Sequence, residues 1–179
     1  MTPRRWVATV VLLVVVGVSG CTGSGRPNGR DSSGPLSLGD ASTVLCVPAP
    51  VGTATMGHRV LRHLGGNEAV LTAVELIDPV DLELVGAFLV PEGDDGLILT
   101  GIESTFPPRK PIRGWSERRE VVGSRVAAGE EWGTGFGLRR TAPEGRASGV
   151  RLRYEVRGRD HVVVYDTDVT LVADRCAGG

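Results

Sequence analysis

The stretch VRLRYEVRGRDHVVVYDTDVTLV, from Val150 to Val172, has a period of two. In its first part apolar residues alternate with charged ones, so that Val150, Leu152, Tyr154 and Val156 share one face of a strand and Arg151, Arg153, Glu155 and Arg157 share the other. The segment RGRD (157–160) is typical of a turn. On the return strand the core face would carry Val163, Tyr165, Val169 and Leu171. The stretch therefore predicts an antiparallel β-hairpin that is buried on one face.

Further strand-like runs precede this hairpin. They are rich in aliphatic and β-branched residues, they are separated by Gly, Pro, Asn and Asp, and they lie at 42–47, 53–64, 68–77, 82–91, 97–102, 118–126 and 132–141. EGDDG (92–96) is a hairpin-type turn. No segment has an apolar stripe of period 3.6 with helix caps. The pattern predicts an all-β, antiparallel β-sandwich of about 7–9 strands.

Residues 59–76, RVLRHLGGNEAVLTAVEL, resemble the hairpin of immunoglobulin-like domains from surface and envelope proteins, with His63 where that pattern usually has Asn. Residues 126–165 are similar to the C-terminal part of uncharacterised actinobacterial lipoproteins. These resemblances imply an immunoglobulin-like sandwich over residues 41–179 and carry no assigned chemistry.

The N-terminus has the layout of a secretory signal peptide. Arg4 and Arg5 precede an apolar run at 7–18, which is too short for a membrane-spanning helix. The next residues complete the tetrapeptide VSGC (18–21), which resembles the lipobox of bacterial lipoproteins. The resemblance implies cleavage before Cys21 and attachment of a diacylglyceryl group to its thiol. We expect residues 1–20 to be the signal peptide and the protein to be anchored on the extracytoplasmic face of the cell membrane. A plain signal peptide is the alternative, and the export route stays open.

Residues 21–40 contain the lipidated cysteine and a segment with five glycines, four serines and two prolines, so we expect a flexible linker there. Without residues 1–20 the chain has 18 basic against 21 acidic residues, a formal charge of −3. This balance excludes nucleic acid as an expected partner. Lys110 is the only lysine among 20 basic residues, which indicates a GC-rich coding genome. About 135 residues follow the linker, enough for one domain.

Three cysteines are present. If Cys21 carries lipid, an even pair is left in an oxidising compartment, and we expect a disulfide between Cys46 and Cys176. Two free thiols are the alternative. The sequence contains no Cys-x-x-Cys pair, so the cysteines do not indicate redox chemistry or a metal site.

Candidate metal ligands are few. Met56 and His58 lie two residues apart on one expected strand and so share a face. With His161 they could bind copper through thioether and imidazole ligands, although ordinary solvent-facing side chains are the simpler interpretation. His63 is the remaining histidine of the sequence. Calcium could bind among the late aspartates at 160, 166, 168 and 174, but no EF-hand spacing is present, and Asp166 and Asp168 would more simply mark the exposed face of an edge strand. We expect no cofactor.

The most distinctive loop is PPRKPIRGWSERRE (107–120). It carries five basic residues, namely Arg109, Lys110, Arg113, Arg118 and Arg119. They could contact anionic headgroups or an anionic wall polymer. The alternative is a solvated crossover with Trp115 packed inward.

No Gly-x-Ser-x-Gly, His-Glu-x-x-His or phosphate-loop motif occurs, and GTGFG (133–137) lacks the dinucleotide-binding spacing, so we do not expect an enzyme. We expect a membrane-anchored extracytoplasmic lipoprotein that serves as a binding or interaction module of the cell envelope. Its partners would be membrane lipid, through the anchor, and an envelope protein or anionic polymer. A copper-handling lipoprotein is the first alternative, and a hydrolase or transferase the second.

Overall fold

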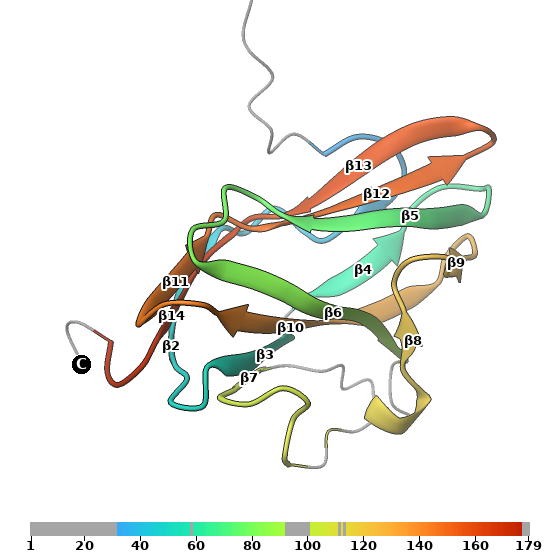
Figure 1. Cartoon of the computed structure of the whole chain (residues 1–179). Helices are drawn as coiled ribbons and strands as arrows, with labels where there is room; N and C mark the ends of the chain where they lie inside the picture. Colours follow the sequence, from blue (N-terminus) through green and yellow to red (C-terminus); the bar gives the residue numbers. More distant parts are fainter. Residues whose placement is uncertain (1–31, 58, 92–100, 111, 113, 177–179) are drawn as a thin grey trace, which may run out of the picture.

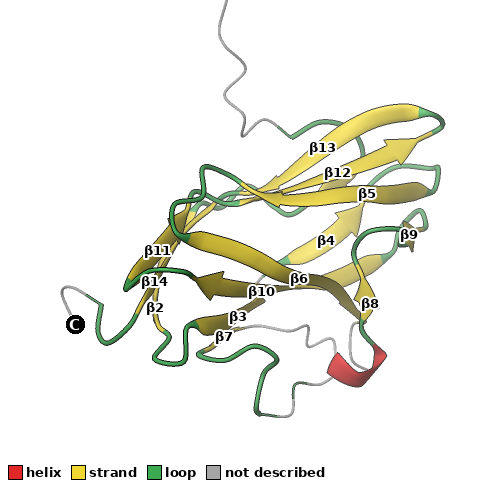
Figure 2. Cartoon of the chain, viewed as in Figure 1, coloured by secondary structure: helices red, strands yellow, loops and turns green. Residues whose placement is uncertain are grey.

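A computed structural model describes residues 32–57, 59–91, 101–110, 112 and 114–176. In this part of the chain the regular structure is strands and one 3-10 helix (Figures 1 and 2). The elements are β1 (Leu36–Ser37), β2 (Thr43–Pro48), β3 (Thr53–Gly57), β4 (Val60–His63), β5 (Ala69–Leu76), β6 (Leu82–Pro91), β7 (Gly101–Glu103), η1 (Trp115–Glu117), β8 (Arg119–Glu120), β9 (Arg125–Val126), β10 (Glu131–Arg140), β11 (Glu144–Ala147), β12 (Val150–Val156), β13 (Arg159–Tyr165) and β14 (Thr167–Val172). The predicted all-β, antiparallel sandwich is confirmed, with more and shorter strands than the 7–9 expected and with one parallel pair, β2 and β14.

The first layer is a seven-stranded sheet built around β10. Strand β6 pairs along one side of β10, and β3 and β4 lie end to end along the other, opposite residues 136–139 and 131–133. Strand β7 then pairs with β3, β1 with β4 and β8 with β6. The single strand predicted over 53–64 is therefore two strands. The interruption lies near Arg59, whose carbonyl oxygen accepts hydrogen bonds from the backbone and side chain of Thr134.

The second layer contains the C-terminal hairpin. Its main sheet has four strands in the order β13-β12-β5-β9, and the chain continues from β13 into β14 of a separate three-stranded sheet, β11-β14-β2. The chain passes from β11 to β12 at Gly149, where φ is +145° and a Cβ atom would lie 2.5 Å from the carbonyl oxygen of Tyr165. The predicted hairpin is confirmed, but its return strand divides at Asp166. Figure 1 shows β5, β12 and β13 on the opposite side of the core from β4, β6 and β10.

The core lies between these layers. The alternation of apolar residues along 150–172 correctly predicted which side chains of this stretch lie in the core. Every residue expected on the inner face of the hairpin is buried apart from the half-buried Val156, and this set comprises Val150, Leu152, Tyr154, Val163, Tyr165, Val169 and Leu171. The ring of Tyr165 stacks on that of Phe136 in β10, with 5.9 Å between centroids, and so joins the two layers.

Strand β2 pairs with β14 in parallel, with Cys46 opposite Thr170. Cys176 follows the end of β14 and forms the expected disulfide with Cys46 across 130 residues of sequence. The bridge therefore ties the C-terminal segment to the first long strand of the domain.

The expected linker boundary at residue 40 is wrong, because the domain includes residues from Ser32 onward. Leu36 and Leu38 are buried, and the Tyr154 hydroxyl donates to the Ser33 carbonyl oxygen at 2.6 Å and accepts from the Leu36 N–H at 3.0 Å. Gly34 lies at φ +79°, where a Cβ atom would be 2.6 Å from the Tyr154 oxygen and from Nδ1 of His161. This glycine permits close docking, although composition suggested flexibility.

Residues 59–76 do not form the hairpin that their resemblance implied, because β4 belongs to the first layer and β5 to the second. The connection crosses the sandwich. Nδ1 of buried His63 accepts a hydrogen bond from the Gly65 N–H at 3.0 Å, as an Asn side chain does in an Asx turn. The departure from the expected Asn thus keeps the local turn chemistry.

Three other expectations need correction. The run 118–126 divides into β8 and β9, which pair with different layers. The short strands β1 and β11 were not predicted, because two to four residues give no readable period. Strand β14 lies between β11 and β2, so Asp166 and Asp168 do not mark an edge strand. The turn 92–96 and residues 97–100 lie outside the described residues.

Candidate functional site

The loop at 107–120 is packed on an aromatic cluster. The Trp115 ring lies 5.3 Å from that of Phe88 and 6.5 Å from that of Phe106, both in edge-on geometry. The Phe106 ring covers the backbone of Gly86 and Gly137, where a Cβ atom at Gly137 would lie 2.5 Å from it. The inward packing of Trp115 is therefore confirmed, and GTGFG supplies a flat surface for a ring.

Arg118 lies on this cluster from the solvent side, whereas Arg119, the next residue along the edge strand β8, lies on a different ring, that of Trp132 in the main core. The Arg118 guanidinium carbon lies 4.8 Å from the Trp115 ring centroid and 5.1 Å from that of Phe88, and its Nη1 donates to the Trp115 carbonyl oxygen at 2.8 Å. The Arg119 guanidinium carbon is 3.8 Å from the Trp132 ring centroid. Both arginines are exposed. We call these two arginines with Phe88, Trp115 and Trp132 the arginine–aromatic surface.

Glu130 borders this surface. One of its carboxylate oxygens accepts from the Ala127 N–H at 2.8 Å and from Nε1 of Trp132 at 3.2 Å. These hydrogen bonds, first that from Ala127, and the nearby charge of Arg119 lower the pKa of Glu130. The hydrogen bond from Trp132 to this carboxylate holds the ring that Arg119 covers.

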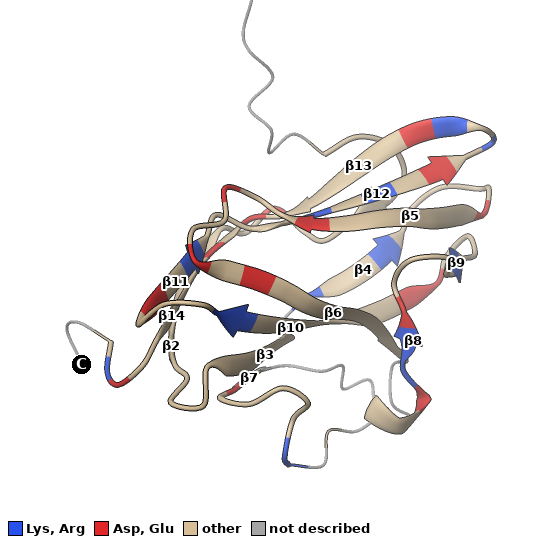
Figure 3. Ribbon diagram, viewed as in Figure 1, with Lys and Arg blue, Asp and Glu red and all other residues tan. Residues whose placement is uncertain are grey.

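Two further basic residues of the loop, Arg109 and Lys110, do not join this surface. Arg109 and Lys110 are exposed at a separate bend of the loop, seen as blue at the bottom of Figure 3, and Lys110 Nζ lies 4.0 Å from Glu103. Arg113 lies outside the described residues. The structure thus stacks Arg118 and Arg119 on aromatic rings and leaves Arg109 and Lys110 away from those rings.

The arginine–aromatic surface and the first described residue lie at opposite ends of the domain. Ser32 and Ser33 hydrogen-bond to β13, through Val164 N–H to Ser32 Oγ at 3.0 Å and Ser33 N–H to the Val162 carbonyl oxygen at 2.6 Å. In Figure 1 this edge is at the top, whereas η1 and β8 are at the lower right.

The expected copper ligands do not form a described site. Met56 is buried in the core at 1% exposure, and His161 stacks on Tyr154 with 5.4 Å between ring centroids. His63 is also buried, so neither Met56 nor His63 is solvent-facing as expected, and His58 lies outside the described residues. Among the described residues no group of three His, Cys, Asp or Glu side chains could hold a metal ion.

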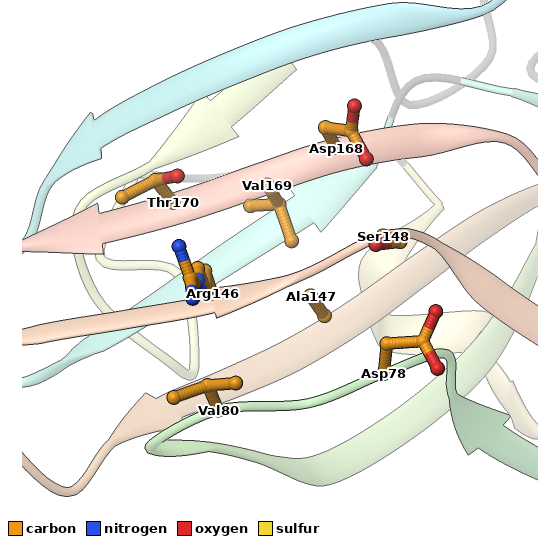
Figure 4. Close-up of a pocket in the computed structure, with 8 residues that line it drawn as sticks. All are labelled: Asp78, Val80, Arg146, Ala147, Ser148, Asp168, Val169 and Thr170. Carbon is orange, nitrogen blue, oxygen red and sulfur yellow. The ribbon is translucent and has the colours of Figure 1, made fainter.

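A cleft that the sequence did not reveal lies over β11, β14 and the turn at 78–81. Its volume is about 380 Å³, and it is lined by Asp78, Val80, Arg146, Ala147, Ser148, Asp168, Val169 and Thr170 (Figure 4). These residues come from three separate segments with no shared motif. The available signal was the DPVD turn (78–81), because turns rich in Asp and Pro carry exposed polar groups.

The 78–81 turn is held in a strained conformation. Asp78 and Asp81 have φ values of +46° and +50°, which non-glycine residues seldom adopt. Backbone hydrogen bonds pair Val80 with Arg146 in both directions at 2.8 Å, and Gly145 leaves room for the Asp81 carbonyl group. Strand β11 therefore fixes the turn and places Asp78 beside the cleft.

No family model and no curated protein matches the sequence. Among solved structures, the chain is similar to the ASH/PapD-like domain of human CEP192, with 7% identity and a TM-score of 0.39 over 97% of this chain and 100% of that one. It is also similar to the Vibrio cholerae protease VesB, with 13% identity and a TM-score of 0.38 over 75% of this chain, and spans 31% of the length of VesB. Likenesses of this size carry no functional argument. In the described part of the chain no helix is long and apolar enough to span a membrane.

Proposed function

We propose that the protein is a lipid-anchored extracytoplasmic lipoprotein that serves as a binding module of the cell envelope and contacts an anionic polymer through its arginine–aromatic surface. The observation that carries this proposal is the position of Arg118 and Arg119, exposed and stacked on aromatic rings at the end of the domain opposite Ser32. Stacked guanidinium groups keep their charge and their hydrogen-bonding edges while losing less side-chain entropy on binding.

The site of attachment favours a polymer over the headgroups of the protein's own membrane. If Cys21 carries lipid, ten residues, 22–31, separate the anchor from Ser32. Fully extended, the eleven Cα-to-Cα steps from Cys21 to Ser32 span at most about 40 Å, which is comparable to the breadth of about 38 Å of a compact domain of this size. Because this tether joins the domain at the end opposite the arginine–aromatic surface, we expect that surface to be directed away from the membrane.

No observation favours the alternative of copper handling. Met56 packs in the core opposite Phe136, and its neighbour on the other side is Ile102 of β7. A copper ion at this thioether would require opening of the first layer.

The proposal is tested by sedimentation of the detergent-solubilised full chain with insoluble cell-wall fragments that retain their anionic polymers. We expect binding that weakens as sodium chloride rises from about 0.05 to 0.5 M, because exposed charges are screened. Replacing both Arg118 and Arg119 by Gln should lower binding by at least about five-fold, whereas Lys at both positions, which keeps the charge but loses the planar stack, should give an intermediate value.

The matched control replaces Arg157 and Arg159 by Gln, because these exposed arginines lie on the β12–β13 hairpin, away from η1. Its binding should equal that of the unmodified chain. Equal losses in both double variants would overturn the assignment of the surface. The chain could instead bind phosphatidylglycerol vesicles through Arg118 and Arg119 and fail to bind wall fragments. This result would show that the surface contacts membrane lipid and not a wall polymer.

A further inference from the structure

The cleft over β11 and β14 has opposite charges at its two ends. Figure 4 shows Asp78 and Asp168 with Ser148 at one end, and Arg146 beside Thr170 at the other. Val80, an exposed apolar side chain, lies on the same side as Arg146, and the buried Ala147 and Val169 form the floor between the two ends. Asp78 and Arg146 are therefore separated along the cleft.

Two of these charged groups are available to a ligand. Asp78 and Arg146 are exposed, and neither side chain has a hydrogen-bond or ion-pair partner among the described residues. They do not pair with each other, although both line the same cleft. A guanidinium group binds a carboxylate through two parallel hydrogen bonds, and a carboxylate accepts readily from an ammonium group.

The cleft is also preorganised. The strained turn that presents Asp78 is fixed by backbone hydrogen bonds on both sides, from Ile77 N–H to the Gly149 carbonyl oxygen at 2.9 Å, and between Val80 and Arg146 at 2.8 Å. The Asp81 carbonyl oxygen accepts from Thr141 N–H at 2.9 Å. Strain at a non-glycine residue persists only where its surroundings determine the conformation, and such positions cluster at binding sites.

We propose that this cleft binds a zwitterionic ligand of the size of a short peptide, with its ammonium group at Asp78 and its carboxylate at Arg146. Ser148 would lie beside the ammonium end of the ligand and Thr170 beside its carboxylate end, and Val80 would contact its apolar part. A cleft of about 380 Å³ falls within the range of small-ligand sites. This site is separate from the arginine–aromatic surface, and the inference does not depend on the proposed function.

The test is calorimetric titration of the detergent-solubilised full chain with three probes that differ only at their ends, namely dialanine, N-acetyl-dialanine and dialanine amide. Dialanine carries both charges, the acetylated probe lacks the ammonium group and the amide lacks the carboxylate. We expect dialanine to bind, and each single-charge probe to bind at least about ten-fold more weakly, since a hydrogen bond between charged groups would be lost. Absence of dialanine binding at about 10 mM would overturn the proposal.

Two variants test which residue binds each charged end of the ligand. Asp78→Asn keeps a residue that tolerates positive φ and should make dialanine bind as weakly as its acetylated form. Arg146→Gln should make dialanine bind as weakly as the amide. The matched controls Asp160→Asn and Arg159→Gln, both exposed on β13, should leave all three affinities unchanged. Unchanged dialanine affinity in Asp78→Asn and Arg146→Gln, with thermal unfolding as in the unmodified chain, would contradict the assignment.

Discussion

The Tyr154 hydroxyl donates a hydrogen bond of 2.6 Å to the carbonyl oxygen of Ser33, and so attaches the N-terminal segment to the second layer of the sandwich. The same oxygen accepts from the Leu36 N–H, while the ring packs in the core. One side chain thus determines where the domain begins, which in turn shortens the tether that we propose between the lipid anchor and the folded chain.

Replacing Tyr154 by Phe should destabilise the domain by about 1–3 kcal/mol, because the buried Leu36 N–H and the Ser33 carbonyl group lose their partner. Urea unfolding measures the free energy, and hydrogen exchange at Leu36 should rise by more than exchange in β10. Ser37→Ala is the control in the same segment, since Ser37 Oγ accepts only an exposed bond from Gly39. Equal losses of stability in the two variants would show that Tyr154 does not hold the segment.

Gly34→Ala and Gly39→Ala form a matched pair. The φ values of Gly34 and Gly39 are +79° and +78°, so both substitutions carry similar backbone strain of about 1 kcal/mol. Only at Gly34 would the new Cβ atom lie 2.6 Å from Tyr154 and His161, whereas at Gly39 the nearest atom is 3.5 Å away. Gly34→Ala should therefore have the clearly lower midpoint of thermal unfolding. Indistinguishable midpoints would mean that residues 32–38 are not docked as described.

The disulfide should contribute strongly to stability. In the chain-entropy model, a loop of 130 residues corresponds to about 4–5 kcal/mol, and measured values are often smaller. Replacing both Cys46 and Cys176 by Ser should lower the free energy of unfolding in urea, and dithiothreitol should lower the stability of the unmodified chain but not of the variant. A variant as stable as the oxidised chain, or equally sensitive to dithiothreitol, would contradict this prediction.

Glu75 should make stability depend on pH in the acidic range. Its carboxylate accepts hydrogen bonds from Arg151 at 2.8 Å and Arg153 at 3.0 Å, and these lower its pKa from the ordinary value of 4.5, the bond from Arg151 most. A carboxyl group whose pKa is lower in the folded state stabilises the fold above pH 4.5, and this contribution disappears as the pH falls through the folded pKa.

Urea unfolding from pH 7 to pH 3 measures this dependence. Glu75→Gln should flatten it, since the carboxylate that binds the two arginines is removed. Glu144→Gln, at an exposed position of β11, is the control and should keep the slope of the unmodified chain. If the free energy of unfolding has the same pH dependence in all three proteins, Glu75 does not contribute to the loss of stability in acid.

The fold was predictable where residues alternate over long strands. β6, β10 and the C-terminal hairpin were located within one or two residues because each presents a buried face against a solvated one or a continuous apolar run. Pairing partners were not predictable in the same way. Residues 59–76 show that two adjacent runs can belong to different layers, since local sequence specifies strands but not the sheet that they join.

The candidate sites were less predictable. Trp115 and the loop arginines were identified, but the split between Arg118 with Arg119 and Arg109 with Lys110 depends on the loop conformation. Gly34 was misassigned because composition alone cannot separate a glycine that permits docking from one in a linker. The cleft at Asp78 and Arg146 is formed by segments that lie about 70 residues apart in the sequence, which no local pattern reveals.

Attachment at Cys21 is the central claim, and membrane fractionation of cells that produce the unmodified chain or Cys21→Ala tests it most directly. The disulfide residues Cys46 and Cys176 stay in place, so the variant should fold normally. We expect the unmodified protein in the membrane pellet, with an intact mass that shows cleavage before Cys21 plus a diacylglyceryl group, and the variant in the soluble extracytoplasmic or secreted fraction. Retention of Cys21→Ala in the membrane, or an unmodified chain whose mass shows no lipid, would contradict the account.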